Sequence, residues 1–545
     1  MKDALKNLIS KIPKEVSHVT DALEKAGFEA YLVGGCVRDL VMGREPKDWD
    51  VTTNAKPEQI MELFEKTVYE NTFGTVAVCV PYETQDNNVS QETNLNNVIR
   101  ETSKYKIIEV TPYRIEAKYS DLRHPDEVKF SNKLEDDLQR RDFSINAMVL
   151  NPKGHLTDMF GGIKDIESKT LRIVGKPEDR FREDALRMLR AVRFACQLDF
   201  FVSYETTESI LKNADLIKKI SFERIRDEFE KIITSANPSS GLVMLQKFGL
   251  LKNIIPELEE GIGCEQLGEH IYDVWDHLLH ALQHAADKNW SLEIRLAALF
   301  HDIGKSKTRR LATPSPTKNS GAFALGDKRT GDPRRIEFLS GQASISTKKK
   351  YTFYGHEVVG ARMARKIMER LKFPKKEIEL VEKLVRNHMF FSDTELITLS
   401  AVRRIIVKVG QENIWALMNV RECDRVGMKK KEAPYRLRKY FAMIEEALRD
   451  PISVGQLKID GEFMIKELGI KPGPRMGWIL SALLEEVLNT PNRNTVEELS
   501  KLVESLNLLG DKELKALGDK GKEKKEELEE EEIAKLHQKH GVRIN

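Results

Sequence analysis

The sequence lacks the features of secreted, membrane-spanning and zinc-finger proteins. Its five cysteines are widely separated among 545 residues and form no CxxC pair, so we expect reduced cysteines in the core. No run approaches the roughly 18 apolar residues of a membrane span. Charges are scattered through the opening segment, MKDALKNLISKIPKEVSHVT, where a signal peptide would be apolar. We therefore expect a cytoplasmic protein without a membrane segment and with no evident obligate protein partner.

Neither sign of charge dominates. The chain has 88 Lys and Arg residues against 86 Asp and Glu residues, for a net charge of +2. This balance does not by itself indicate a nucleic-acid partner, so any RNA-binding surface must be a local patch. The length suggests three or four domains at about 150 residues each.

An α/β segment opens the chain, and long amphipathic helices follow it. Residues 29–54 predict a strand, a glycine turn, a helix and a second strand, and apolar strands are predicted over 73–80 and 106–114. From about residue 178 apolar residues recur at three- and four-residue spacing, as in EDALRMLRAVRFACQL. The sequence therefore predicts an N-terminal α/β domain, the head, followed by a helical region.

Two acidic residues, Asp48 and Asp50, lie in DWDVTTN, which we predict to be a strand. Residues two apart in a strand point to the same face, so the two carboxylates repel unless cations bind them. A two-metal site has this requirement, although many such pairs are plain surface turns. Glu109, in a later predicted strand with Thr111 on its face, is a candidate third carboxylate.

Phosphate-binding groups are predicted beside these carboxylates. Gly34 and Gly35 in VGGCVRD end a strand and open a helix, which exposes backbone N–H groups to a triphosphate. Arg38 follows in the first helical turn, where it can reach a phosphate oxygen. Arg141, beside Asp142 in RRDFSINAM, is a further candidate to neutralise phosphate charge. The alternative for the glycines is an ordinary strand-to-helix turn with a surface arginine.

A helix is predicted to begin near Arg182 and to carry Asp184 and Arg187 on one face at i, i+3. Taken alone, this pattern also fits a helix with intrahelical ion pairs.

The motifs GGCVRD, DWD, EVTPYR, RRDFSINAM, DMFGGIKD and EDALRMLRAVRF occur in this order over about residues 20–265. This series resembles class II tRNA nucleotidyltransferases and the related bacterial poly(A) polymerases. The resemblance implies magnesium binding by Asp48 and Asp50, and we expect Glu109, from its place in the later strand, to join them as a catalytic carboxylate. It implies nucleotide binding by the following residues: Gly35, Arg38, Arg141, Asp184, Arg187, Arg190 and Arg193. Pro112, Ser144 and the polar segment before Glu109 depart from the family pattern without removing a ligand.

The chemistry of Asp184 and Arg187 suits CTP and ATP. Cytosine and adenine both present an amino donor beside a ring-nitrogen acceptor, which an Asp acceptor and an Arg donor can satisfy. Uracil and guanine would oppose a carbonyl to the carboxylate, at a cost of roughly 1 to 3 kcal/mol per unsatisfied group. Residues 118–130, with Asp121 and Arg123, resemble the family's flexible loop for adding the final A. Addition of CCA to tRNA is therefore the expected activity.

A second metal pattern begins after residue 270. An adjacent His-Asp pair followed by IGK resembles the HD phosphohydrolase superfamily, which implies a divalent-metal site formed by His277, His301, Asp302 and Asp424. His356 and His388 are candidates for a second metal. Imidazoles with carboxylates suit manganese, nickel, magnesium or iron. The resemblance implies a phosphodiesterase that repairs RNA ends.

The expected fold class is α+β, with a nucleotidyltransferase-type α/β head followed by an all-α neck, body, HD domain and C-terminal helical region. The expected divisions are a head over 1–150, a neck and body over 151–270, an HD domain over 271–430, a tRNA-binding region over 431–510 and a charged tail over 511–545. Two polar segments, 85–104 and 306–350, are predicted to be insertions, the second disordered. Two other functions stay open: a poly(A) polymerase, and a metal phosphohydrolase whose head only binds RNA.

Overall fold

The computed structural model describes the following residues: 10–70, 74–81, 105–116, 128–266, 271–311, 351–389, 399–426, 435–448 and 457–540. The chain divides into two compact units, residues 1–386 with 423–429 and residues 387–422 with 430–545. No helix within the described ranges is long and apolar enough to cross a membrane. The predicted insertion 85–104 lies outside the described residues, as do Asp121, Arg123 and residues 312–350.

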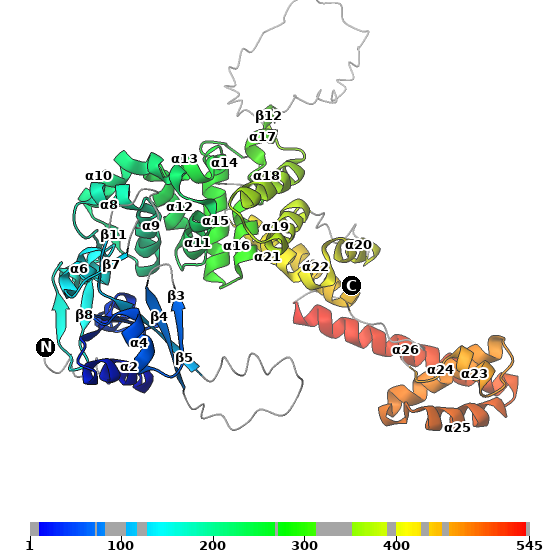
Figure 1. Ribbon diagram of the computed structural model, residues 1–545. Helices are drawn as coiled ribbons and strands as arrows, with labels where there is room; N and C mark the ends of the chain where they lie inside the picture. Colours follow the sequence, from blue (N-terminus) through cyan, green and yellow to red (C-terminus); the bar gives the residue numbers. More distant parts are fainter. Residues whose placement is uncertain are drawn as a thin grey trace, which may run out of the picture. The chain divides into compact units, whose positions relative to one another are not determined.

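A seven-stranded sheet forms the N-terminal part of the first unit (Figure 1), in the order β3-β4-β5-β2-β1-β8-β9. Its strands are β1 (Ala30–Val33), β2 (Asp50–Thr53), β3 (Thr67–Glu70), β4 (Thr75–Pro81), β5 (Tyr105–Pro112), β8 (Met148–Leu150) and β9 (Leu156–Asp158). β2 and β5 are parallel, and the other neighbours are antiparallel. The mixed sheet matches the α/β head expected from the sequence.

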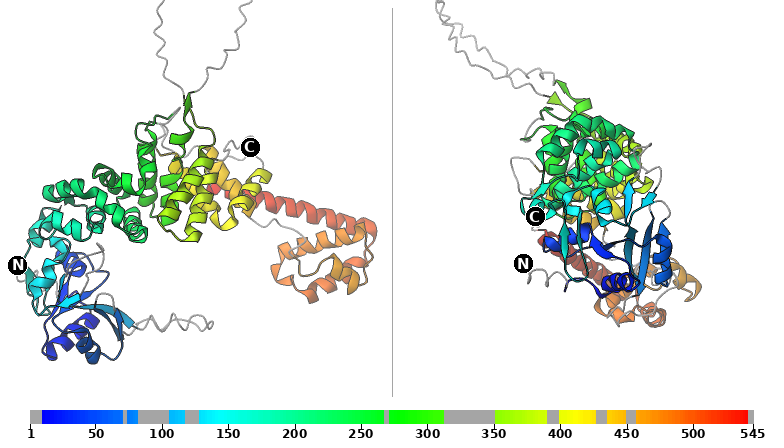
Figure 2. Two further views of the ribbon diagram at one scale, coloured as in Figure 1. Left: turned by 45° about the horizontal axis from the view of Figure 1, so that its top comes forward. Right: turned by 60° about the vertical axis from the view of Figure 1, so that its left-hand side comes forward.

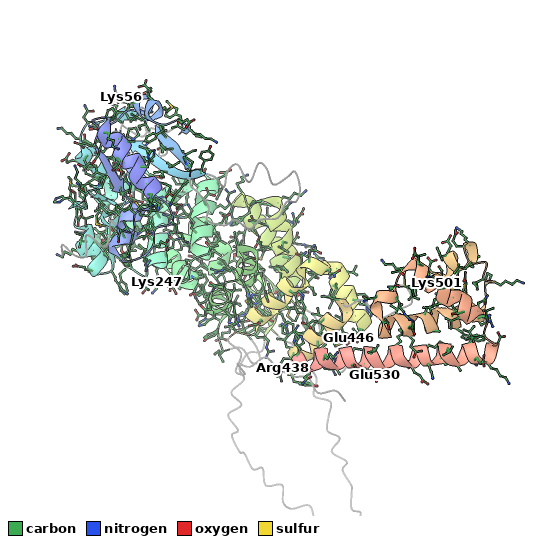
Figure 3. All side chains as sticks on the ribbon, turned by 90° about the horizontal axis from the view of Figure 1, so that it is seen from below. Lys56, Lys247, Arg438, Glu446, Lys501 and Glu530 are labelled. Carbon is green, nitrogen blue, oxygen red and sulfur yellow. The ribbon has the colours of Figure 1, made fainter. Side chains whose placement is uncertain are left out.

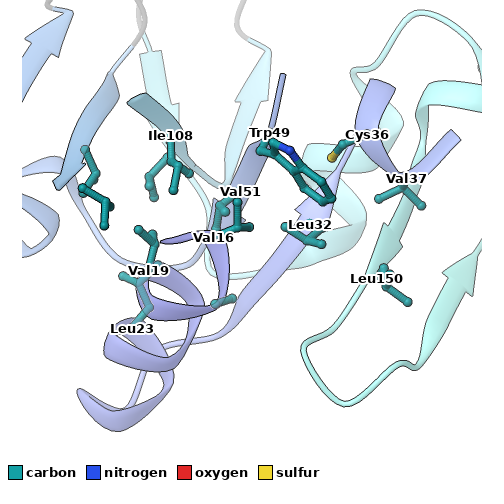
Figure 4. Packing of buried hydrophobic residues seen from close by; sticks show 14 of the residues in the cluster. Val16, Val19, Leu23, Leu32, Cys36, Val37, Trp49, Val51, Ile108 and Leu150 are labelled. Carbon is teal, nitrogen blue, oxygen red and sulfur yellow. The ribbon is translucent and has the colours of Figure 1, made fainter. Parts of the chain in front are cut away.

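One face of this sheet is covered by α2 (Lys14–Lys25) and α4 (Pro57–Leu63). Val16 of α2, Val51 of β2 and Ile108 of β5 are fully buried in the same apolar cluster (Figure 4). Because side chains alternate along a strand, the neighbours of Val51 and Ile108 point to the opposite face. Apolar packing on one face thus presents the acidic residues on the other.

Helices make up nearly all of the rest of the first unit (Figure 2). Those used below are α3 (Gly35–Val41), α6 (Leu134–Gln139), α8 (Pro177–Glu183), α9 (Leu186–Leu198), α11 (Phe222–Ile233), α12 (Pro238–Lys247), α15 (Val274–Asp287), α16 (Leu292–Phe300), α18 (His356–Arg370) and α19 (Lys375–Asn387). The expected α+β fold class, a mixed head sheet followed by a largely helical remainder, is confirmed.

The predicted disordered insertion is wrong at its start. Residues 305–308 form α17 (Lys305–Thr308), and β12 (Arg310–Leu311) then pairs with β13 (Tyr351–Thr352). Residues 306–311, SKTRRL, include a single apolar residue and so give no periodicity from which an element could be predicted, and the partner strand lies far along the chain.

The second unit is helical, with α22 (Tyr435–Leu448), α24 (Pro474–Asn489), α25 (Val496–Asn507) and α26 (Asp511–Lys539). Within the charged segment predicted over 511–545, residues 511–539 form α26, which packs on α24. A Cβ at Gly518 would lie 2.9 Å from the Cα of Trp478, and one at Gly521 would lie 2.2 Å from the carbonyl oxygen of Ser481. Glycine therefore permits this close packing. At the other end of α26, His537 contacts Glu446 of α22 (Glu446 is labelled in Figure 3).

Candidate active site

Three carboxylates are placed along neighbouring strands. The strand predicted around DWD begins only at Asp50, and Asp48 lies in the bend before it. The buried Trp49 between them still separates two exposed or half-exposed carboxylates. In the parallel pairing of β2 with β5, Asp50 is the register partner of Glu109. Glu109 alternates with the buried Ile108 and therefore lies on the same face as Asp50.

Asp50 lies in an environment that resists its negative charge. Burial raises the pKa of Asp50, the Arg141 guanidinium lowers it, and the neighbouring Asp48 raises it, with a net rise. A bound cation would reverse this penalty, because an opposite charge favours the ionised carboxylate. The donor set, three carboxylates on one sheet face, is the type that Mg²⁺ prefers. The residues present therefore fit a divalent metal.

The glycine turn lies directly beside these carboxylates. Gly34 has a φ of 80°, which disfavours other residues, and it precedes α3, which begins at Gly35. A Cβ on Gly34 would lie 3.2 Å from Nη1 of Arg141 and 3.5 Å from Oδ2 of Asp50. The turn therefore needs a residue without a side chain, because only then can Arg141 and Asp50 lie this close to it.

A cavity of about 910 Å³ opens over this turn. Among its lining residues are Gly35, Asp48, Asp50, Arg38, Arg141, Arg190 and Arg193. The structure thus brings together both carboxylates of the DWD motif and four of the five arginines predicted to bind a nucleotide. Guanidinium groups facing one cavity with a divalent-cation site are suited to a triphosphate.

Buried carboxylates hold these arginines in place. Asp137 of α6, fully buried, accepts from Nη2 of Arg141 at 3.1 Å and also binds Arg140. Asp142 accepts from Nε of Arg190 at 2.8 Å. Burial alone would raise the pKa of Asp142, but Arg190 outweighs it and lowers that pKa to about 2.

Glu228 of α11, which no sequence motif indicated as a site residue, is only 3% exposed. Its Oε1 accepts from Nη1 of Arg193 at 3.0 Å, and Arg193 also stacks over the ring of Phe194 at 4.1 Å. Arg38 in turn donates to Oδ1 of Asn146 at 2.9 Å. Asp137 carried a detectable signal, because it lies three and four residues before two arginines in LEDDLQRR. Glu228 carried none, since its partner is on another helix.

The prediction that Asp184 and Arg187 share one face of a single helix is wrong. Asp184 ends α8 with an extended backbone, and α9 begins only at Leu186. The reason is local: Oδ1 of Asp184 accepts from the Leu186 N–H at 3.0 Å, the bond that a capping Asp offers a new helix. Its Oδ2 accepts from Nη2 of Arg224 at 2.7 Å, and Arg187 donates to Glu183. Neither Asp184 nor Arg187 lines the cavity.

A second cluster is buried among α15, α16 and the end of α21 (Ile414–Asp424). Ligand atoms of His277, His301, Asp302 and Asp424 all lie within 4.8 Å of one another. Nε2 of His277 is 3.1 Å from Nε2 of His301, and Oδ2 of Asp302 is 3.3 Å from that same atom of His301. These four residues, predicted from sequence, are brought together by the structure.

The cluster has the chemistry of a divalent-metal site. Nδ1 of His301 is 2.8 Å from the Ala298 carbonyl, an arrangement that turns Nε2 toward the cluster. Asp302 directs its other oxygen, Oδ1, to Nε2 of His356 at 3.2 Å. Lys305, which the sequence analysis did not assign, donates from Nζ to Oδ2 of Asp302 at 2.6 Å. Lys305 also lowers the pKa of Asp302 against the opposing effect of burial.

The remaining predicted residues are placed as follows. His388 directly follows α19 and belongs to the second unit, so its role beside His356 stays a prediction. His280 stacks on Tyr272, and His284 meets the edge of Trp290, consistent with ordinary helical histidines.

Known families match three successive parts of the chain. The Poly A polymerase head domain matches residues 30–172, the probable RNA- and SrmB-binding site of polymerase A matches 199–262, and the HD domain matches 274–429. The chain belongs to the family of class II CCA-adding enzymes and poly(A) polymerases. Its head, RNA-binding and HD parts occur in the order expected from the sequence motifs.

Relatives within this family are CCA-adding enzymes. The chain is 42% identical over 239 residues to that of Ligilactobacillus salivarius, covering 43% of this chain and 54% of the relative. It is 42% identical over 233 residues to that of Bacillus velezensis, covering 43% and 53%. The chain thus spans about half the length of the curated relatives it matches. A crystal structure of the Bacillus stearothermophilus CCA-adding enzyme in complex with CTP is similar at 25% identity and a TM-score of 0.52, covering 91% of this chain and 97% of that one.

Proposed function

We propose that this protein adds CCA to tRNA 3′ ends, using CTP and ATP and releasing pyrophosphate. The observation that carries the proposal is the joint placement of Asp48, Asp50 and four arginines at one cavity beside Glu109. The similarity to a CCA-adding enzyme in complex with CTP over most of the chain supports the same function.

The three carboxylates would hold magnesium, which supplies charge to activate the RNA hydroxyl and to stabilise the leaving pyrophosphate. Gly34 and Gly35 let the triphosphate approach the backbone, and Arg38 and Arg141 bind its oxygens. Asp137 keeps Arg141 extended toward the cavity, so less entropy is lost when phosphate binds.

Base selection is assigned to Asp184 and Arg187. Both are engaged in the structure, Asp184 with Arg224 and Arg187 with Glu183. For these bonds to be replaced by bonds to a base, Asp184 must separate from Arg224 and Arg187 from Glu183. The strength of these two ion pairs therefore affects the free energy of base binding. An Asp acceptor and an Arg donor together match cytosine and adenine.

A direct assay separates this function from its alternatives. Transcripts of tRNA ending one, two or three nucleotides before the complete CCA end are incubated with CTP and ATP together, each labelled in turn, and then sequenced. We expect one, two or three added residues, respectively, that complete CCA and then stop. A long A tail identifies a poly(A) polymerase, and no incorporation above the Asp48→Asn/Asp50→Asn control identifies a head that only binds RNA.

A second activity is supported by the buried His-Asp cluster. We propose that it hydrolyses 2′,3′-cyclic or terminal phosphates at RNA ends, which would prepare damaged ends for extension. His277, His301, Asp302 and Asp424 would hold a divalent metal, which supplies an activated water. The test is hydrolysis of 2′,3′-cyclic AMP with Mn²⁺, Ni²⁺, Mg²⁺ or Fe²⁺ added, with an Asp424→Asn variant as the control.

A further inference from the structure

One wall of the nucleotide cavity is formed by the turn between α11 and α12. Thr234, Ser235 and Ala236 of this turn line the cavity together with the charged residues described above. The turn follows the C-terminus of α11, where the last carbonyls of a helix have no partner within the helix. Its position therefore depends on donors from elsewhere.

Those donors come from the region that carries the second metal cluster. Arg295 of α16 is only 6% exposed. Its Nη1 donates to the carbonyl oxygens of Ile233 at 2.9 Å and Ser235 at 2.8 Å. Its Nε donates to the Trp290 carbonyl at 2.9 Å, which fixes the guanidinium to its own domain. A cation at the end of α11 is also favoured by the helix dipole.

A second donor comes from α15. Nε2 of Gln283 donates to the carbonyl of Ala236 at 2.8 Å, and its Oε1 accepts from Oγ of Ser239 at 2.9 Å. Two helices of the HD-like region thus hold three carbonyls of one turn: those of Ile233, Ser235 and Ala236. The loss of the donor to the two buried carbonyls, those of Ile233 and Ser235, costs roughly 1 to 3 kcal/mol per group, and the Gln283 bond adds a further restraint at the exposed Ala236, so the turn has little freedom while these bonds exist.

The same helix, α11, also positions an arginine of the cavity. Glu228 lies on α11 and binds Arg193 at 3.0 Å. A helix moves as a rigid element, so a shift at the end of α11 would displace Glu228 and the arginine it holds. The hydrogen bonds from Arg295 to Ile233 and Ser235 are therefore connected to Arg193 by continuous contacts through α11.

We infer that Arg295 and Gln283 are positioning residues for nucleotide binding: the HD-like region holds in place the turn that forms one wall of the nucleotidyltransferase cavity. The inference rests on the proposed function in assigning CTP and ATP to that cavity. Neither residue touches the carboxylates, so their effect falls on nucleotide binding more than on the chemical step.

The test measures the Kd for CTP by equilibrium dialysis, and KM and kcat for CTP on tRNA lacking CCA. Arg295→Met keeps the aliphatic stem and removes the donors, and Gln283→Met does the same on α15. We expect each to raise Kd and KM about tenfold with kcat within about twofold, the pattern of lost ground-state binding. Arg295→Lys, which keeps the charge and can reach one carbonyl, should lie between Arg295→Met and wild type.

Val381→Ala is the matched control for stability. Val381 is fully buried in α19 and does not line the cavity, and its truncation lowers the Tm of the same unit by leaving a void in the core. We expect it to leave Kd and KM at wild-type values. The inference is overturned by unchanged Kd in both Met variants, or by an equal rise in Val381→Ala. Normal CTP binding without transfer by the wild type would contradict the proposed function alone.

Discussion

Asp50 of β2 is the parallel-strand partner of Glu109 of β5, and both alternate with buried valines, so the two carboxylates lie on one open face of the sheet. Adjacent strands lie about 4.8 Å apart, a spacing from which two carboxylates can reach one or two shared cations. This pairing makes Glu109 part of the same acidic group as the DWD motif.

Glu109→Gln should lower kcat for CTP addition by at least about 100-fold, because loss of a group that only orients a ligand already costs 10- to 100-fold. The measurement is single-turnover incorporation at saturating CTP over a range of magnesium concentrations. Glu109→Asp is the matched control and should recover part of the rate at high magnesium. Wild-type rates in Glu109→Gln would remove Glu109 from the catalytic group.

Asp48→Asn and Asp50→Asn should each abolish nucleotide addition with little change in Tm. Asp48 is exposed, and burial raises the pKa of Asp50, so neither charge stabilises the fold. Thermal unfolding and primer extension on the same preparations test both parts. Incorporation by both variants at ordinary magnesium would contradict the two-metal assignment.

His301→Ala should reduce both the metal content of the purified protein and its 2′,3′-cyclic phosphodiesterase activity, while CCA addition is retained. His301 lies within the four-residue group, whereas His356 lies outside that group and is 3.2 Å from the other oxygen of Asp302, Oδ1. His356→Ala should therefore retain the metal bound by His277, His301, Asp302 and Asp424. Elemental analysis after dialysis distinguishes the two variants, and equal metal loss from both would contradict a separate four-ligand site.

Asp184→Ala should weaken discrimination between CTP and UTP by about 1 to 3 kcal/mol, or roughly 5- to 150-fold in the ratio of kcat/KM. It removes both the acceptor for cytosine and the repulsion against the uracil carbonyl. The measurement is kcat/KM for all four NTPs.

Arg224→Ala is the control for this prediction, because it removes the present partner of Asp184 and leaves the carboxylate. We expect it to retain the preference for CTP and ATP. If both variants lose activity equally for all four NTPs, Asp184 only braces the junction between α8 and α9.

Stability should fall with acid as the Asp142–Arg190 pair is lost. The pKa of Asp142 is lowered from 3.8 to about 2, so its contribution is complete above the unfolded value and disappears as pH falls through the folded value. The shift corresponds to about 2 kcal/mol between pH 5 and pH 1. In wild type, the free energy of unfolding measured with urea should fall between pH 5 and pH 2. In Asp142→Asn, the part of this fall that comes from Asp142 should be absent. An identical slope in both proteins would contradict the assignment.

Much of both sites followed from local spacing. Asp48 and Asp50 flank the apolar Trp49, and with Trp49 buried both carboxylates remain on the other side. The adjacent His301 and Asp302 follow a helix of buried residues, and their place at its end holds in any fold that buries that helix. Gly34 before a helix predicted the bare turn for a similar local reason.

Only the tertiary structure decided which residues meet across the chain. The strand order makes Glu109 the neighbour of Asp50, Glu228 of one helix holds Arg193 of another, and Arg295 holds the turn of the cavity wall. Periodicity determines the face on which a side chain lies, but not the element that faces it, because many packings bury the same apolar stripe. Asp184 shows the same limit locally: its capping bond and its contact with Arg224 ended the helix that its spacing predicted.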